Sequence, residues 1–186
     1  KIIDSVTKAY SNKAREYKGD FKISFNITGK SLCWDIESFI EEKVKKYSIP
    51  EERLWIEITE QDVISKNDVS VATLNRLKEK GHTLLIDDFG MGHTSLLYLQ
   101  SGYFGVVKLD GSLVKDIVKS KATQNIVKSV IELGNRMGIK VIAEFVESKE
   151  QVEVLHSLGC NNYQGYLFSK PIPLENFISY IIENNS

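Results

Sequence analysis

The sequence predicts a parallel α/β fold, in which strands alternate with helices that cover the sheet. Two observations predict it. Six short apolar runs, rich in β-branched and aromatic residues, recur along the 186 residues with amphipathic segments between them. Nearly every run also carries an acid or an amide at its C-terminal end. Such ends converge on one face of a parallel barrel, and an open doubly wound sheet also binds its ligands there, so both architectures fit.

The six runs are predicted to be strands, and they are Phe21–Ile27, Leu54–Ile58, Thr83–Ile86, Val106–Leu109, Lys140–Ala143 and Asn162–Leu167. Two intervening segments space apolar residues three and four apart, which indicates helices that face the core. These apolar residues are Phe39, Ile40, Val44 and Tyr47, then Ile126, Val127, Val130 and Ile131. Glycines 81, 138 and 159 are expected to end helices just before strands. Further helices are expected at residues 2–10 and 177–181.

Adjacent carboxylates stand out in the segment LLIDDFGMGHTSL, where Asp87 and Asp88 follow an apolar run. Consecutive strand residues point to opposite faces, so both carboxylates reach one site only where the strand ends and its backbone turns. Taken alone, the pair fits a solvated turn as well as a divalent-metal site. Other strand ends supply further polar residues, and these are Asn26, Glu57, Glu60, Lys108, Asp110, Glu144, Glu147 and Gln164.

Carboxylate and amide oxygens are the ligands that Mg²⁺, Mn²⁺ or Ca²⁺ prefer. Two such ions in one site favour phosphodiester hydrolysis, because they stabilise both the attacking and the leaving oxygen. Lys108 is a candidate to offset phosphate charge, and Glu144 is a candidate to accept a proton from the attacking water. The alternative for Lys108 is a surface lysine paired with Asp110. Glu60 and Glu147 fit equally well as acids at helix N-termini.

Other readings carry less weight. Receiver domains of signalling proteins also place acids and a lysine at strand ends, but too many strands contribute here. His93 follows the aspartates, although a lone histidine more often forms a hydrogen bond or faces solvent than binds metal. Three aromatic residues near the C-terminus are expected to pack, with a nucleobase-stacking role as the alternative. They are Tyr163, Tyr166 and Phe168.

Bulk properties exclude several functions. With 24 basic and 25 acidic residues the net charge is −1, so no overall field attracts a nucleic-acid polymer or an anionic membrane. Cys33 and Cys160 lack metal-site or disulfide spacing, which favours a reducing cytoplasm. Apolar stretches are too short to span a membrane, although a longer parent protein could be tethered to one. Because the chain begins at Lys1, we expect it to be part of a longer protein.

Six motifs, in this order, resemble the EAL domain family of cyclic di-GMP phosphodiesterases. They are ISFNIT, WIEITE, LLIDDFGMGHTSL, VKLD, VIAEFVE and YQGYLFSKP. The resemblance runs from about Phe21 to Pro173 and treats the 186 residues as a single domain. It implies a TIM-type (β/α)8 barrel that hydrolyses cyclic di-GMP to linear pGpG with two Mg²⁺ or Mn²⁺ ions.

The resemblance also implies a role for each residue that matches a motif. Glu144 matches the general base, Lys108 the catalytic lysine and Gln164 a substrate-binding glutamine. Glu60 resembles the acid that anchors the loop after Asp88, and Glu147 resembles a supporting acid. The implied metal ligands are Asn26, Glu57, Asp87, Asp88 and Asp110. The loop GMGHTSLL is implicated in a homodimer, and sensor or GGDEF domains are expected upstream in the parent protein.

The chain departs from the family pattern at three places. His93 stands where tyrosine is usual, and Phe145 replaces a glycine, so we expect both to tune the site. The Glu-Ala-Leu motif does not occur in the chain. The resemblance therefore predicts an N-terminally incomplete domain that lacks one metal ligand and about two strands. A catalytically inactive module that binds cyclic di-GMP or a partner protein is the alternative function.

Overall fold

The computed structural model describes residue 4 and residues 21–32, 35–59, 68–90, 99–173, 176–177 and 179–180. Its centre is a parallel sheet of five strands in the order β1-β2-β3-β4-β5. The strands are β1 (Ile23–Ile27), β2 (Leu54–Thr59), β3 (Thr83–Phe89), β4 (Phe104–Leu109) and β5 (Lys140–Ala143). Each strand pairs with its successor in the sequence. This is the order of a barrel wall, whereas the strand order of a doubly wound sheet reverses at its switch point.

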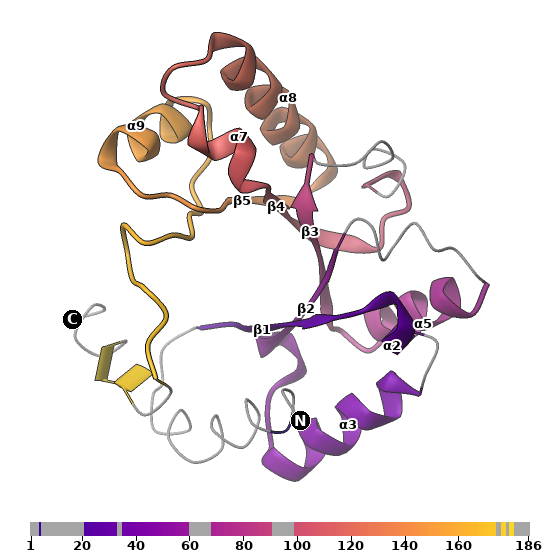
Figure 1. Cartoon of the computed structure of the whole chain (residues 1–186). Coiled ribbons are helices and arrows are strands. Elements are labelled where there is room, and N and C mark those ends of the chain that lie inside the picture. The colour runs from indigo at the N-terminus through magenta and orange to yellow at the C-terminus, as the bar shows by residue number, and fades with distance from the viewer. Residues whose placement is uncertain are drawn as a thin grey trace.

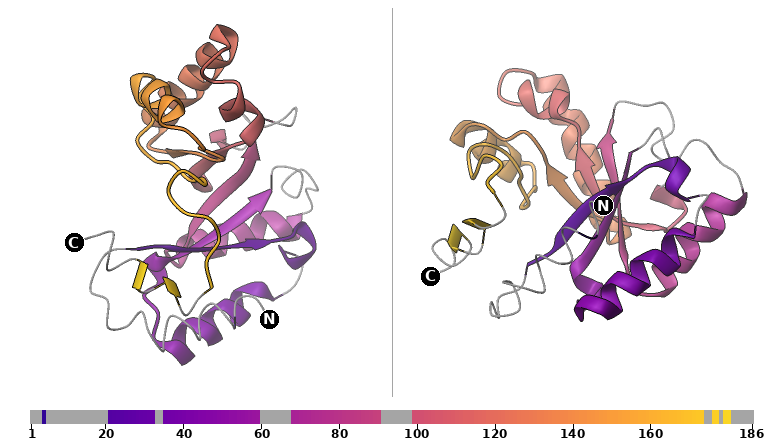
Figure 2. Two further views of the ribbon diagram at one scale, coloured as in Figure 1. Left: turned by 60° about the vertical axis from the view of Figure 1, so that its left-hand side comes forward. Right: turned by 60° about the horizontal axis from the view of Figure 1, so that its bottom comes forward.

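Helices fill the connections between strands, as the sequence predicts. They are α2 (Gly29–Leu32), α3 (Ile36–Tyr47), α5 (Asp68–Glu79), α7 (Gly111–Lys115), α8 (Lys121–Met137) and α9 (Lys149–Ser157), with a 3-10 turn η2 (Glu51–Arg53). In Figure 1 the strands form an arc, and α3, α5 and α8 lie on its outer side. Figure 2 shows α3 and α5 side by side against β1 and β2. The fold is thus the helix-covered wall of an α/β barrel.

The two faces of the sheet have different surroundings because side chains alternate along each strand. Leu84 and Ile86 of β3 belong to the main hydrophobic core, between the strands and the outer helices. Leu85 is just as buried but lies outside that core cluster. It points, with Asp87, to the inner side of the arc. The inner side therefore carries the polar ends of the strands, and the outer side holds the fold together.

Helix α8 confirms most of its predicted core face and corrects one residue. Val127 and Ile131 are buried, and Val130 packs partly buried against the core. Ile126 was expected in the core but is 53% exposed. The buried stripe follows Val127, Ile131 and Gly134, four and then three residues apart, and Ile126 lies beside it. In α3, all four predicted apolar residues are buried or packed against the core.

The predicted sixth strand, Asn162–Leu167, is wrong in its extent. Only Tyr163 forms a bridge, with Ala143 of β5. Pairing then skips a residue, because the next backbone hydrogen bond runs from the N–H of Val146 to the carbonyl of Gln164. The skipped residue is Phe145, whose backbone is left-handed with φ of 54°. Apolar patterning in the sequence does not reveal this interruption.

Several predictions fall on residues that the structure does not describe. They concern Cys33, Glu60 and His93, the apolar residues of the expected helix at 2–10, and Ile178 and Ile181 of the closing helix. Glycines 81, 138 and 159 do adopt positive φ, as expected for residues that end helices. None of the described helices combines the length and the hydrophobicity needed to cross a membrane.

Candidate active site

Asp87 and Asp88 lie within β3 rather than after it, which corrects the expected strand end at Ile86. The pairing of β3 with β4 is irregular between Ile86 and Phe89, and Asp88 has a φ of 57°. A bulge of this kind re-aims side chains and breaks the alternation of a regular strand. Both carboxylates consequently reach one site. Asp87, Asp88 and Glu144 each place a carboxylate oxygen within 4.8 Å of the other two.

Lys108 lies on β4 with its ammonium group among carboxylates from three other segments. Its Nζ is 2.7 Å from Oε1 of Glu144 and 2.8 Å from Oε2 of Glu57. A third carboxylate oxygen, Oδ1 of Asp87, is 3.3 Å away. Lys108 is only 5% exposed, so the alternative of a surface lysine paired with Asp110 is wrong. Carboxylates from three chain segments therefore surround one buried cation on a fourth, at the C-terminal ends of the strands.

Burial shifts pKa values within this group of charged side chains. It raises the pKa of Glu144 to about 7, with Lys108 opposing the shift and Asp87 adding to it. Burial would lower the pKa of Lys108, but hydrogen bonds to Glu144 and Glu57 outweigh it and raise that pKa above its ordinary value. Burial, followed by the negative charges of Asp87 and Asp110, also raises the pKa of Asp88. Added positive charge would stabilise these carboxylates in their ionised form.

The remaining predicted ligands occupy the same end of the sheet. Asn26 of β1 is in register with Glu57 of β2, so both side chains project from the same face. Asp110 directly follows β4, and its carboxylate accepts a hydrogen bond from the N–H of Ser112 at 2.8 Å. Asp110 thereby caps the N-terminus of α7. It still lies near enough to Asp88 to influence that carboxylate.

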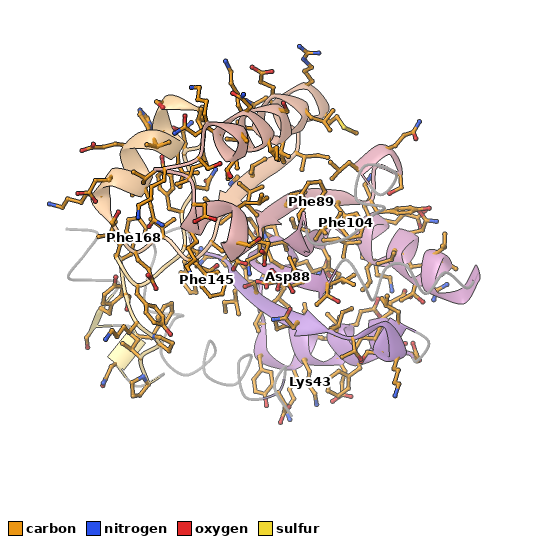
Figure 3. The ribbon with its side chains drawn as sticks, turned by 45° about the horizontal axis from the view of Figure 1, so that its top comes forward. Lys43, Asp88, Phe89, Phe104, Phe145 and Phe168 are labelled. Atoms are coloured by element: carbon orange, nitrogen blue, oxygen red, sulfur yellow. The ribbon has the colours of Figure 1, made fainter. Side chains whose placement is uncertain are left out.

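A pocket of about 330 Å³ adjoins the carboxylates on the side of the C-terminal segment. The residues that line it are Glu144, Phe145, Glu147, Gln164, Gly165 and Tyr166. Gln164 and Glu147 are both exposed there. Tyr163, Tyr166 and Phe168 were expected to pack. Tyr163 packs partly buried against the core and Phe168 stacks on its ring, whereas Tyr166 is exposed. Figure 3 shows Phe145 and Asp88 at the same end of the sheet.

Gln151 supports the site, and our reading of the sequence missed it. Its side-chain oxygen accepts hydrogen bonds from the backbone N–H groups of Glu147 and Ser148, at 2.7 and 3.0 Å. Its amide nitrogen donates to the carbonyl of Val114. Gln151 thus ties the loop after Glu144 to α7. The pattern Ser148-x-x-Gln151 is a capping box, a signal that is readable from sequence.

The donor set fits a divalent metal ion. The described residues bring together three carboxylates whose oxygens lie within 4.8 Å of one another, and burial raises the pKa of Asp88 and of Glu144. Oxygen donors of this kind suit hard cations such as Mg²⁺, Mn²⁺ and Ca²⁺. Glu57 is bound to Lys108, and Asn26 lies beside it in the sheet. Their side chains carry further oxygen atoms on the same face of the sheet.

Comparison with protein families and curated sequences gives a consistent result. A family model for the EAL domain matches residues 1–171, which extends the resemblance upstream of Phe21. The probable cyclic di-GMP phosphodiesterase PdeA of Escherichia coli is 33% identical over 174 residues, which are 93% of this chain and 24% of PdeA. The chain spans about a fifth to a quarter of the length of the first curated relatives that it matches.

Solved structures match the fold. The EAL enzyme Bd1971, bound to cAMP and cyclic di-GMP, superposes with a TM-score of 0.90 at 32% identity, over 97% of this chain and 50% of that chain. BlrP1 of Klebsiella pneumoniae, in a complex with manganese and cyclic di-GMP, has a TM-score of 0.83 at 32% identity, over 91% of this chain and 44% of that chain. BlrP1 has also been solved with calcium and cyclic di-GMP.

Proposed function

The chain belongs to the EAL domain family, and on this premise we propose that it forms the catalytic part of a cyclic di-GMP phosphodiesterase. The reaction adds water across one phosphodiester bond and yields linear pGpG. One observation carries the proposal: Asp87, Asp88 and Glu144 bring carboxylate oxygens within 4.8 Å of one another at the C-terminal ends of parallel strands. The name of PdeA supports this substrate, and the cyclic di-GMP bound to Bd1971 supports the same ligand.

The proposed metal ligands are Asn26, Glu57, Asp87, Asp88 and Asp110. Two divalent ions held there would polarise the phosphate and activate a water molecule. Both Mg²⁺ and Mn²⁺ suit the oxygen donors, and the BlrP1 complex with manganese supports Mn²⁺ as the ion for a first assay.

Glu144 is proposed as the general base that takes the proton of the attacking water. Its carboxylate is 2.7 Å from Nζ of Lys108 and has an oxygen within 4.8 Å of those of Asp87 and Asp88, so it lies beside the proposed metal ligands. Lys108 orients Glu144 and Glu57 through its hydrogen bonds and adds positive charge beside the pentacoordinate phosphorus. Gln164, on the wall of the adjoining pocket, is proposed to bind the substrate. Glu60 and Glu147 stay predictions as anchoring acids.

A module that binds without catalysis is not favoured, because every implied catalytic group in the described residues is present. The parent protein is proposed to carry further domains, because the relative MucR of Pseudomonas aeruginosa is named a bifunctional diguanylate cyclase and cyclic di-GMP phosphodiesterase. A cytoplasmic location stays a prediction from the sequence. A homodimer stays a prediction from the family resemblance, since residues 91–98 lie outside the described part.

The direct test incubates the protein, in its full natural length, with cyclic di-GMP and Mn²⁺ and follows the formation of linear pGpG by chromatography. We expect pGpG in the presence of the ion and none after chelation. Retained binding of cyclic di-GMP without any product would contradict the enzymatic proposal and support the binding module.

A further inference from the structure

Phe145 is an unusual residue to find beside a charged site. It follows Glu144 directly, and 61% of its surface is exposed. Its φ of 54° is a left-handed conformation that bulky residues rarely adopt. An exposed phenyl ring in a disfavoured backbone conformation contributes little to the hydrophobic core. Folding alone therefore does not account for this residue.

One glycine lies against the ring, and a second lies against the backbone of the residue that follows it. A Cβ atom added to Gly111 would lie 2.6 Å from Cδ2 of Phe145, so the ring rests directly on the backbone of Gly111. On the other side of the loop, a Cβ atom added to Gly165 would lie 2.1 Å from the carbonyl oxygen of Val146. Gln151 ties the same loop to α7. The loop that carries Phe145 is thus tied to its neighbours on both sides, and one side of the ring lies on Gly111.

The surroundings of the ring combine a flat apolar surface with polar groups. Phe145 and the exposed Tyr166 line the pocket of about 330 Å³, together with the amide of Gln164 and the carboxylate of Glu147. A ligand that fits this pocket has a flat aromatic body and hydrogen-bonding groups along its edge. Nucleobases have both, and they stack on aromatic side chains. The carboxylates that face the phosphate begin at the adjacent residue, Glu144.

We propose that Phe145 carries the face of one nucleobase of the substrate and so positions the adjoining phosphodiester at Asp87, Asp88 and Glu144. This inference rests on the proposed phosphodiesterase function and adds a specificity residue to it. Phe145 acts by binding and takes no part in proton transfer. The competing explanation is that the ring serves only to fill the space above Gly111.

Three substitutions of Phe145, assayed in the full natural length of the protein with cyclic di-GMP and Mn²⁺, separate these explanations. Phe145→Leu keeps apolar bulk without an aromatic face, and Phe145→Gly also relieves the left-handed backbone. Both should raise KM by about 5- to 100-fold, with a smaller change in kcat. Phe145→Trp keeps an aromatic face and should stay within about 3-fold of the wild type. Tyr103→Leu, at the opposite end of the sheet, is the matched control and should leave KM unchanged.

The result that overturns the inference is an unchanged KM in both Phe145→Leu and Phe145→Gly. Calorimetric titration of cyclic di-GMP keeps this test separate from that of the proposed function. If the wild type binds cyclic di-GMP without hydrolysing it, the proposed enzymatic function is contradicted. Weaker binding of cyclic di-GMP by Phe145→Leu than by the wild type would still support base stacking. Equal affinities of the two proteins overturn base stacking, and absence of any binding overturns both proposals.

Discussion

Two groups of four charged side chains in this protein differ in charge balance and in the exposure of their cations. The side chain of Lys108 is 6% exposed, whereas those of Lys80 and Arg76 are 36% and 49% exposed. We call Glu57, Asp87, Lys108 and Glu144 the buried charge cluster, and they lie at the C-terminal ends of the strands. We call Glu37, Glu41, Arg76 and Lys80 the surface charge cluster, and they link α3 to α5 on the outside of the sheet. In each group one lysine contacts more than one carboxylate.

The contrast lies in what solvent does to each group. Hydrogen bonds from Lys80 and Arg76, two cations that reach solvent, lower the pKa of Glu37. Burial instead raises the pKa of Glu144 to about 7, although Lys108 is bound to it. In the surface charge cluster, two cations balance the negative charges of two carboxylates. The buried charge cluster holds more negative charge than one lysine satisfies, and a site of that kind is suited to bind further cations.

Removing the buried cation should produce the largest change in stability. Lys108→Met leaves Glu57 and Glu144 buried without their partner, so we expect a loss of about 3–5 kcal/mol in the free energy of unfolding. Urea denaturation of the metal-free protein measures it. The double variant Lys108→Met with Glu57→Gln should recover part of the loss, because one unpaired carboxylate is removed. If Lys108→Met lowered the free energy of unfolding by less than about 1 kcal/mol, the carboxylates of the buried charge cluster would be solvated rather than buried.

Divalent ions should stabilise the protein through the carboxylates at the strand ends and not through the surface charge cluster. Mn²⁺ at about 100 times its dissociation constant should raise the free energy of unfolding by about 2.7 kcal/mol. Asp87→Asn combined with Asp88→Asn should abolish this gain, whereas Glu41→Gln in the surface charge cluster should keep it. Thermal unfolding with and without Mn²⁺ provides the measurement. Equal stabilisation of all three proteins would mean that the ion binds elsewhere.

Acid should lower the stability of the folded protein through His82, which lies near Lys80 and Glu37 of the surface charge cluster. Burial lowers the pKa of His82, and nearby Lys80 adds to the shift while Glu51 and Glu37 oppose it. The folded protein therefore prefers neutral His82. Its contribution is complete above the unfolded pKa of about 6.5 and is lost as the pH falls below it, by at most about 1.4 kcal/mol per pH unit. His82→Asn should flatten the acid limb of stability between pH 6.5 and 5, and the exposed His156→Asn should not.

The smallest effect is expected in the surface charge cluster itself. Arg76 is 49% exposed as a side chain, so Arg76→Met should cost only about 0.2–1 kcal/mol. The loss should shrink further in 1 M NaCl, where the screening length is about 3 Å. Urea denaturation at low and high salt tests both statements. A salt-independent loss comparable to that of Lys108→Met would remove the distinction between the two clusters.

The convergence of Glu57, Asp87, Lys108 and Glu144 was predictable from the sequence, because the C-terminal ends of parallel strands meet on one side of a barrel. The bulge at Asp88 and the left-handed Phe145 were not. Both depend on backbone conformations that non-glycine residues seldom adopt, and tertiary contacts impose them. The prediction of the sixth strand was wrong for the same reason, because the left-handed Phe145 interrupts its pairing with β5.

Exposure was the other property that local pattern did not settle. Ile126 and Tyr166 have apolar or aromatic side chains within apolar segments, yet both face outward. Their positions depend on which neighbouring element covers them. Gln151 shows the reverse case, because its capping box was present in the sequence and its link to Val114 became visible only in the fold.

The most direct test of the central claim removes one negative charge from each cluster and compares turnover of cyclic di-GMP under the same conditions. Glu144→Gln should lower kcat by about 10²–10⁴-fold while cyclic di-GMP still binds, because the variant lacks the general base. Glu37→Gln, with the same change of atoms in the surface charge cluster, should stay within about 2-fold of the wild type. Equal kcat values for the two variants would contradict the assignment of the buried charge cluster as the catalytic centre.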